Sequence, residues 1–128
     1  MRSIKAEWPF LDNKDLAVLP KIQQHIESIL RYCSACNSLT DFETEPMRTE
    51  AVAFNLMQIG ELAKTALSDH AKPQIPSIPW QQLYGMRNRL LHGYAGVHMQ
   101  IVWDTVAEDI PRLKADLDAI LEKSGESL

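Results

Sequence analysis

The sequence lacks the features that mark several large classes of protein. Its 128 residues hold no apolar run near the roughly 18 residues of a membrane-spanning helix, and the first ten residues lack the apolar core of a signal peptide. The only cysteines, Cys33 and Cys36, form a lone C-x-x-C without a second pair or a following H-x-x-x-H. We therefore expect a soluble, cytoplasmic protein without a membrane partner, whose cysteines are small, semi-apolar residues at the end of a helix.

Several catalytic signatures are also missing. No histidine stands three positions after a glutamate, as the Glu-x-x-His pairs of ferritin-like di-metal centres require. A Gly-rich phosphate loop, an H-E-x-x-H motif and a G-x-S-x-G elbow do not occur, so P-loop, zincin and hydrolase-elbow chemistry has no basis here. The sequence predicts neither a metal nor a cofactor.

Acidic residues are missing from one long stretch of an otherwise acidic chain, whose net charge is −4. The stretch between Asp69 and Asp104 holds no Asp or Glu, but it does hold the basic and imidazole side chains Lys72, Arg87, Arg89, His70, His92 and His98. A local positive field suits an anionic ligand such as a phosphodiester. Uneven sampling of charge in a short chain is the alternative, and this feature alone leaves it open.

What the sequence does contain is apolar residues at helical spacing, which predict one domain made of an all-α bundle of four helices. The expected helices cover residues 15–36, 46–68, 80–92 and 99–123. The expected core residues are Leu16, Leu19, Ile22, Ile26, Ile29 and Cys33, then Val52, Leu56, Ile59, Ala63 and Leu67, then Val102, Val106, Ile110, Leu113, Leu117 and Ile120. Residues 1–13 are predicted to be an N-terminal extension, 14–123 the helical bundle, and 124–128 a flexible C-terminus.

Prolines and caps predict where these helices begin, bend and end. Asp15 is a plausible N-cap, and Pro20 marks either the proper start of the first helix or a bend in it. The prolines of residues 72–79 predict an extended connection, Gly93 ends the third helix, and Pro111 is expected to kink the fourth.

The second helix has a further apolar edge. Phe54 and Met57 lie away from its core stripe, and Gly60 sits in mid-helix, where glycine costs about 1 kcal/mol relative to alanine unless another backbone must come close. A helix with two apolar faces in a small bundle is either central or part of an oligomer interface. We expect a homodimer.

The candidate chemistry lies in the segment from Arg87 to Tyr94, inside the acid-free stretch. On a regular helix Asn88 and His92 share a face, whereas Arg87 points roughly 140° away from His92. Convergence therefore needs either a helix end near His92 or a twofold axis that joins the motifs of two chains. Histidine can exchange a proton with a ribose hydroxyl, and arginine can stabilise phosphoryl charge. A helix-capping histidine beside an unrelated arginine is the structural alternative.

The string M-R-N-R-L-L-H-G-Y, residues 86–94, resembles the R-x4-6-H motif of HEPN domains in the R-x4-H-x-Y form of HepT-like toxins. Further similarity lies in residues 55–61, 78–80, 102–103 and 110–113. The resemblance implies a HEPN-like up-down bundle of four to five helices that dimerises and brings both motifs into one cleft. It also implies a metal-independent endoribonuclease with catalytic Arg87 and His92, supported by Asn88.

The same resemblance implies partners. HepT-like toxins act on RNA and belong to type II toxin-antitoxin pairs, in which a minimal nucleotidyltransferase antitoxin can transfer AMP to the motif tyrosine, here Tyr94. The alternative function is a non-catalytic HEPN dimer that serves as a nucleotide- or protein-binding scaffold for a nucleotidyltransferase partner.

Overall fold

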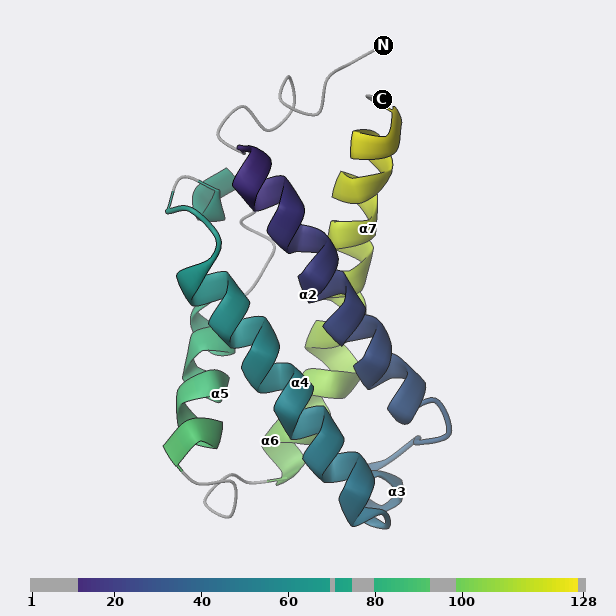
Figure 1. The fold of residues 1–128 in the computed structure, drawn as a ribbon. Coiled ribbons are helices and arrows are strands. Elements are labelled where there is room, and N and C mark those ends of the chain that lie inside the picture. Colours follow the sequence, from purple (N-terminus) through teal and green to yellow (C-terminus); the bar gives the residue numbers. More distant parts are fainter. Residues whose placement is uncertain (1–11, 70, 75–79, 93–98, 127–128) are drawn as a thin grey trace.

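The computed structural model describes residues 12–69, 71–74, 80–92 and 99–126, except for the side chains of residues 74, 91, 92 and 123–126. Its helices are α2 (Asn13–Tyr32), α3 (Leu39–Glu43), α4 (Pro46–Thr65), the 3-10 turn η1 (Lys72–Gln74), α5 (Trp80–His92), α6 (Met99–Asp104), the π-helical turn η3 (Thr105–Asp109) and α7 (Ile110–Glu126). They form an up-down bundle in which α4 packs against both α2 and α5, and α7 against α2 (Figure 1). The predicted all-α bundle is confirmed, and no described residue belongs to a strand.

The predicted apolar stripes form the core. All of the residues expected there are buried except Leu16, which is partly buried and packs against the others. Helix α3 adds Phe42, which is fully buried, and its ring centroid lies 5.6 Å from that of Trp103. No described helix is long and apolar enough to cross a membrane.

The start of α2 differs from the prediction. Asp12, not Asp15, is the N-cap: its carboxylate accepts from the backbone N of Asp15 at 2.8 Å, and the Asp15 carboxylate accepts from the backbone N of Asp12 at 3.2 Å. This reciprocal pair is a capping box. Asp15 is fully buried and also accepts from the backbone N and the Oγ of Ser68, both at 2.8 Å. The carboxylate therefore joins the start of α2 to the segment after α4.

Two of the predicted effects of proline need correction. Helix α2 runs through Pro20, so it does not begin there. The connection after α4 is not extended throughout, because residues 72–74 form the turn η1; residues 75–79 lie outside the described part.

Near Pro111 the helix widens into the turn η3, where the backbone N of Ile110 donates to the carbonyl O of Thr105. Proline has no N–H, and in a regular helix its ring collides with the carbonyl four residues earlier. The irregularity that was expected near Pro111 is therefore a wider helical turn directly before this residue.

One helix was missed and one ends early. Helix α3 was not predicted, although Ser38 caps it by accepting from the backbone N of Asp41 at 3.1 Å. Helix α2 stops at Tyr32 instead of near Cys36. The serine-to-aspartate spacing of such a cap was the available signal for α3, but five residues are too few for an apolar period to show.

Candidate functional site

Gly60 allows α5 to lie directly on α4. A Cβ built at this buried glycine would stand 2.6 Å from the Cβ of Arg87 and 2.8 Å from the carbonyl O of Leu83. Real Cβ atoms do not come that close to other atoms, so any side chain here would push the two helices apart. The close approach of a second helix, which would justify a glycine in mid-helix, is thus present. It also fixes the point on α5 from which the side chain of Arg87 extends.

Polar contacts hold the first half of α5. The hydroxyl of Tyr84 donates to the carbonyl O of Ala63 at 3.2 Å, and the indole N of Trp80 donates to the carbonyl O of Lys72 at 3.1 Å. The Nζ of Lys72 lies 5.3 Å from the centre of the Tyr84 ring, within cation–π range. Helix α5 is therefore tied both to α4 and to η1 before it reaches Arg87.

The guanidinium of Arg87 is held from two sides. Its Nε and Nη2 approach Oε2 of Glu61, on α4, at 2.7 and 2.5 Å, and its Nη1 donates to Oδ1 of Asn88 at 2.8 Å. The side chain of Arg87 is 20% exposed and that of Glu61 is 42% exposed. Arginine has five N–H donors; these contacts engage three of them, and the other two have no partner among the described residues.

Of the other predicted site residues, Asn88 is exposed and bound to Arg87. His92 is the last described residue of α5, and residues 93–98 lie outside the described part, so a helix end near His92 stays a prediction. The side chain of His92 and all of Tyr94 lie outside the described residues. Whether Arg87 and His92 converge therefore stays a prediction.

Acidic side chains from outside the acid-free stretch lie close to its cations in the folded chain. Glu61 reaches Arg87 from α4, and Asp69 pairs with Lys72 at 3.4 Å. The positive charge of the segment is therefore partly compensated: the fold brings Glu61 to Arg87 from α4, and Asp69, at the boundary of the segment, pairs locally with Lys72. Glu61 is a neighbour of the predicted site residue Arg87 that was not expected from the sequence. The signal was its place next to Gly60, since the residue after a helix-contact glycine stands at the edge of that contact.

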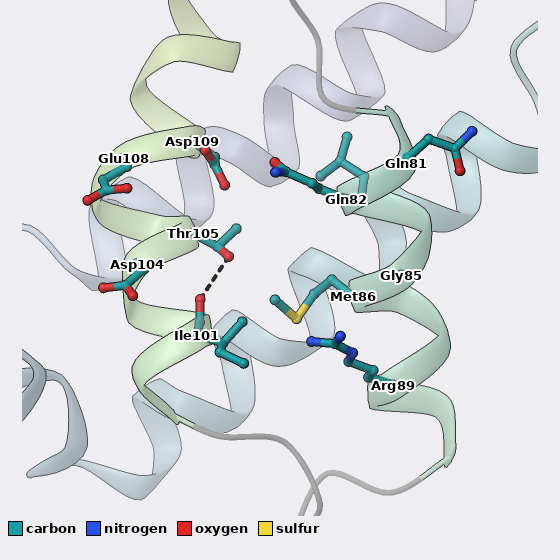
Figure 2. Close-up of a pocket in the computed structure, with 11 residues that line it drawn as sticks. Gln81, Gln82, Gly85, Met86, Arg89, Ile101, Asp104, Thr105, Glu108 and Asp109 are labelled. Carbon is teal, nitrogen blue, oxygen red and sulfur yellow. Dashed lines mark hydrogen bonds between the residues drawn. The ribbon is translucent and has the colours of Figure 1, made fainter.

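A pocket of about 440 Å³ lies on another side of α5, facing α6 and η3 (Figure 2). Its lining residues are Gln81, Gln82, Leu83, Gly85, Met86, Arg89, Ile101, Asp104, Thr105, Glu108 and Asp109. Arg89 reaches toward it from α5, and three carboxylates belong to the opposite wall. Arg87 and Asn88 do not line it. Because the carboxylates outnumber the one arginine, this pocket disfavours a phosphate.

Cys33 is poorly suited to act as a nucleophile. Cys33 and Cys36 are free thiols, and burial raises the pKa of the Cys33 thiol to about 11, so this thiol is protonated at neutral pH. Within the described part of the chain, no three His, Cys, Asp or Glu side chains are grouped so that they could hold a metal ion.

Comparisons with known proteins identify the family of this chain. Residues 22–120 match the family model described as "Ribonuclease HepT-like". The chain is 33% identical over 105 residues, 77% of its length and 93% of the relative's, to "Putative RNase TTE0752" of Caldanaerobacter subterraneus subsp. tengcongensis. It is 38% identical over 80 residues, 62% of its length and 72% of the relative's, to "Probable ribonuclease HepT" of Thermococcus cleftensis. No solved structure matches.

Proposed function

This chain belongs to the ribonuclease HepT-like family, and from that premise we propose that it is a metal-independent endoribonuclease that acts through Arg87, Asn88 and His92. The observation that carries the proposal is the guanidinium of Arg87, which is fixed at the contact of α4 and α5 with two N–H groups left for a phosphate. An RNA phosphate is the anion that a planar donor fork of this kind binds well.

In the proposed reaction His92 removes the proton of a ribose 2′-hydroxyl as its oxygen attacks the phosphorus, or protonates the 5′-oxygen as it leaves. The P–O5′ bond breaks as the P–O2′ bond forms. Negative charge builds on the phosphoryl oxygens, where Arg87 stabilises it. Asn88, one helical turn before His92 and bound to Arg87, supports the arrangement from α5.

We place the working site between two copies of the chain. Met47 and Phe54 on α4 are 76% and 56% exposed, and helical spacing puts both on the face that also carries Glu61. Large apolar side chains exposed in a row favour burial by another surface. A twofold contact along this face would bring the Arg87 of one copy toward the motif of the other, which addresses the angular problem of a single α5.

We further propose that the protein is the toxin of a type II toxin-antitoxin pair whose antitoxin is a minimal nucleotidyltransferase. In the proposed control step the Tyr94 hydroxyl attacks the α-phosphorus of ATP, so that AMP becomes bound to the tyrosine and pyrophosphate leaves. The added anion would stand two residues from His92, where it would repel RNA phosphates and fill the cleft. A small nucleotidyltransferase gene beside this one would support the pairing.

The test is cleavage of tRNA and mRNA by purified protein in excess EDTA, compared with Arg87→Ala and His92→Ala. We expect the wild type to cut and both variants to lose activity by about two to four orders of magnitude, the usual contribution of an acid-base or charge-stabilising group. Arg112→Ala, which removes an exposed arginine from α7, is the matched control and should cut normally. Intact RNA with every protein would overturn the catalytic proposal in favour of a non-catalytic scaffold.

A further inference from the structure

We propose that Glu61 is the positioning residue for Arg87: it fixes the orientation of the guanidinium so that the two free N–H groups meet the RNA phosphate. This inference rests on the proposed ribonuclease function and adds a residue to its machinery. Glu61 lies on α4, whereas Arg87, Asn88 and His92 all belong to α5.

The geometry of the ion pair supports this role. Nε and Nη2 form one edge of the guanidinium, and both approach the same oxygen of Glu61. Asn88 holds Nη1 from the other side of the group. Because three donors are occupied on two sides, the plane of the guanidinium cannot turn without breaking at least one bond. The two remaining N–H groups keep a set direction before any substrate arrives.

The packing below the pair adds to this restraint. The Cβ of Arg87 lies against Gly60, the residue before Glu61, at a distance that would not tolerate a side chain. The stem of the arginine and the carboxylate that orients its head are therefore set by the same turn of α4. An arginine on an exposed helix would instead sample many rotamers, and ordering it would cost conformational entropy on binding.

A competing role for Glu61 would have the opposite effect on activity. A carboxylate that merely occupies the fork in place of a phosphate would have to leave before RNA binds, so its removal would improve binding. The contacts favour positioning, because Glu61 takes one edge of the guanidinium with a single oxygen and leaves two donors unused.

The experiment compares Glu61→Ala and Glu61→Asp with the wild type in single-turnover cleavage of tRNA across a range of RNA concentrations. We expect Glu61→Ala to lower the maximal rate by about a hundredfold, the scale typical of a misplaced catalytic group, with little change in the RNA concentration at half-maximal rate. Glu61→Asp keeps the charge and should recover part of the rate. Glu122→Ala, which removes an exposed glutamate from α7, away from the α4 face proposed as the dimer contact, is the matched control and should leave the rate unchanged.

A double variant separates positioning from a loss of stability. If Glu61 acts only through Arg87, then Glu61→Ala added to Arg87→Ala will slow cleavage no further. Additive losses, or a Glu61→Ala protein that cuts as well as the wild type or better, would overturn the inference.

Hydrogen exchange at the Arg87 Nε–H, followed by NMR, supplies a readout that does not need cleavage. We expect slow exchange in the wild type and in Glu122→Ala, and faster exchange in Glu61→Ala. A wild type that cuts no RNA would defeat the proposed function, and the exchange rates alone would then decide whether Glu61 fixes the guanidinium. Equal exchange in the wild type and Glu61→Ala would defeat the inference while leaving any observed cleavage intact.

Discussion

At the scale of single residues, Asp15 is a buried polar group that joins two distant parts of the bundle. It is fully buried, yet it accepts hydrogen bonds from Asp12 and from two groups of Ser68, which is 53 residues away in sequence. Burial alone would raise the pKa of this carboxyl, but the hydrogen bonds from Ser68 and Asp12 outweigh it and leave the pKa below its ordinary value. The charged form is therefore the one that the fold stabilises.

The sign of the pH dependence follows from that lowered pKa. A carboxyl with a lower pKa in the folded state stabilises the fold fully above its unfolded pKa, near 4, and loses that contribution as the pH falls through the folded value. We expect Asp15→Asn to lower the free energy of unfolding by about 2 kcal/mol at pH 7 and to flatten its decline between about pH 5 and pH 2. Urea denaturation at a series of pH values measures both effects.

Asp118→Asn is the comparison for this prediction. The hydrogen bond from Lys114 lowers the pKa of Asp118 despite partial desolvation, but both side chains are more than a third exposed. Solvent screens such a pair, so its loss should change stability much less than the loss of Asp15. Parallel pH profiles for the wild type and Asp15→Asn would contradict the account of Asp15.

At the scale of elements, the contact between α4 and α5 makes a sharp prediction about two glycines. Gly60→Ala would gain about 1 kcal/mol of helix propensity but force a Cβ against the Leu83 carbonyl and the Arg87 stem, at a cost of about 1–3 kcal/mol. We expect a net loss of about 1 kcal/mol in the free energy of unfolding and slower RNA cleavage. Denaturant unfolding and the cleavage assay measure the two effects.

Gly85→Ala is the internal control on α5. A Cβ at Gly85 would meet nothing within 4 Å, so only the gain in helix propensity remains, and we expect stability to rise by up to about 1 kcal/mol. If both alanines stabilise the protein equally, α5 does not lie against Gly60 as described.

Helix starts and ends show where prediction from sequence was strong and where it was weak. The helix over residues 80–92 was predicted well, because a proline and a glycine bracket its apolar period, and all of its described residues are helical. The N-cap of α2 was misassigned because Asp12 and Asp15 are both good N-cap residues by their local sequence. Only the distant Ser68, which donates to the Asp15 carboxylate, distinguishes the two.

At the scale of the whole molecule, the exposed row on α4 predicts self-association. We expect the wild type to sediment as a dimer at micromolar concentration and Phe54→Asp to sediment as a monomer, because a charge at the centre of an apolar contact is not compensated there. Cleavage should fall together with dimerisation. Ala115→Asp, on the exposed side of α7, is the matched control and should remain dimeric.

Analytical ultracentrifugation and the cleavage assay test this on the same samples. A monomeric wild type that still cuts RNA would exclude the composite site. A dimeric Phe54→Asp protein would instead place the interface on another face.

The sequence by itself determined the all-α bundle, its core and the identity of the R-x4-H-x-Y segment. Those features depend on residue spacings of three, four or five positions, which can be recognised in the sequence without knowing which helices pack together. The surroundings of Arg87 were decided only by the tertiary structure. Glu61 stands 26 residues before it, and the mid-helix Gly60 indicates a close contact without identifying the partner helix, so only the packing of α5 on α4 could bring these residues together. The same packing turned a stretch without acidic residues into a helix with carboxylates on two sides, because charge in space depends on which elements meet.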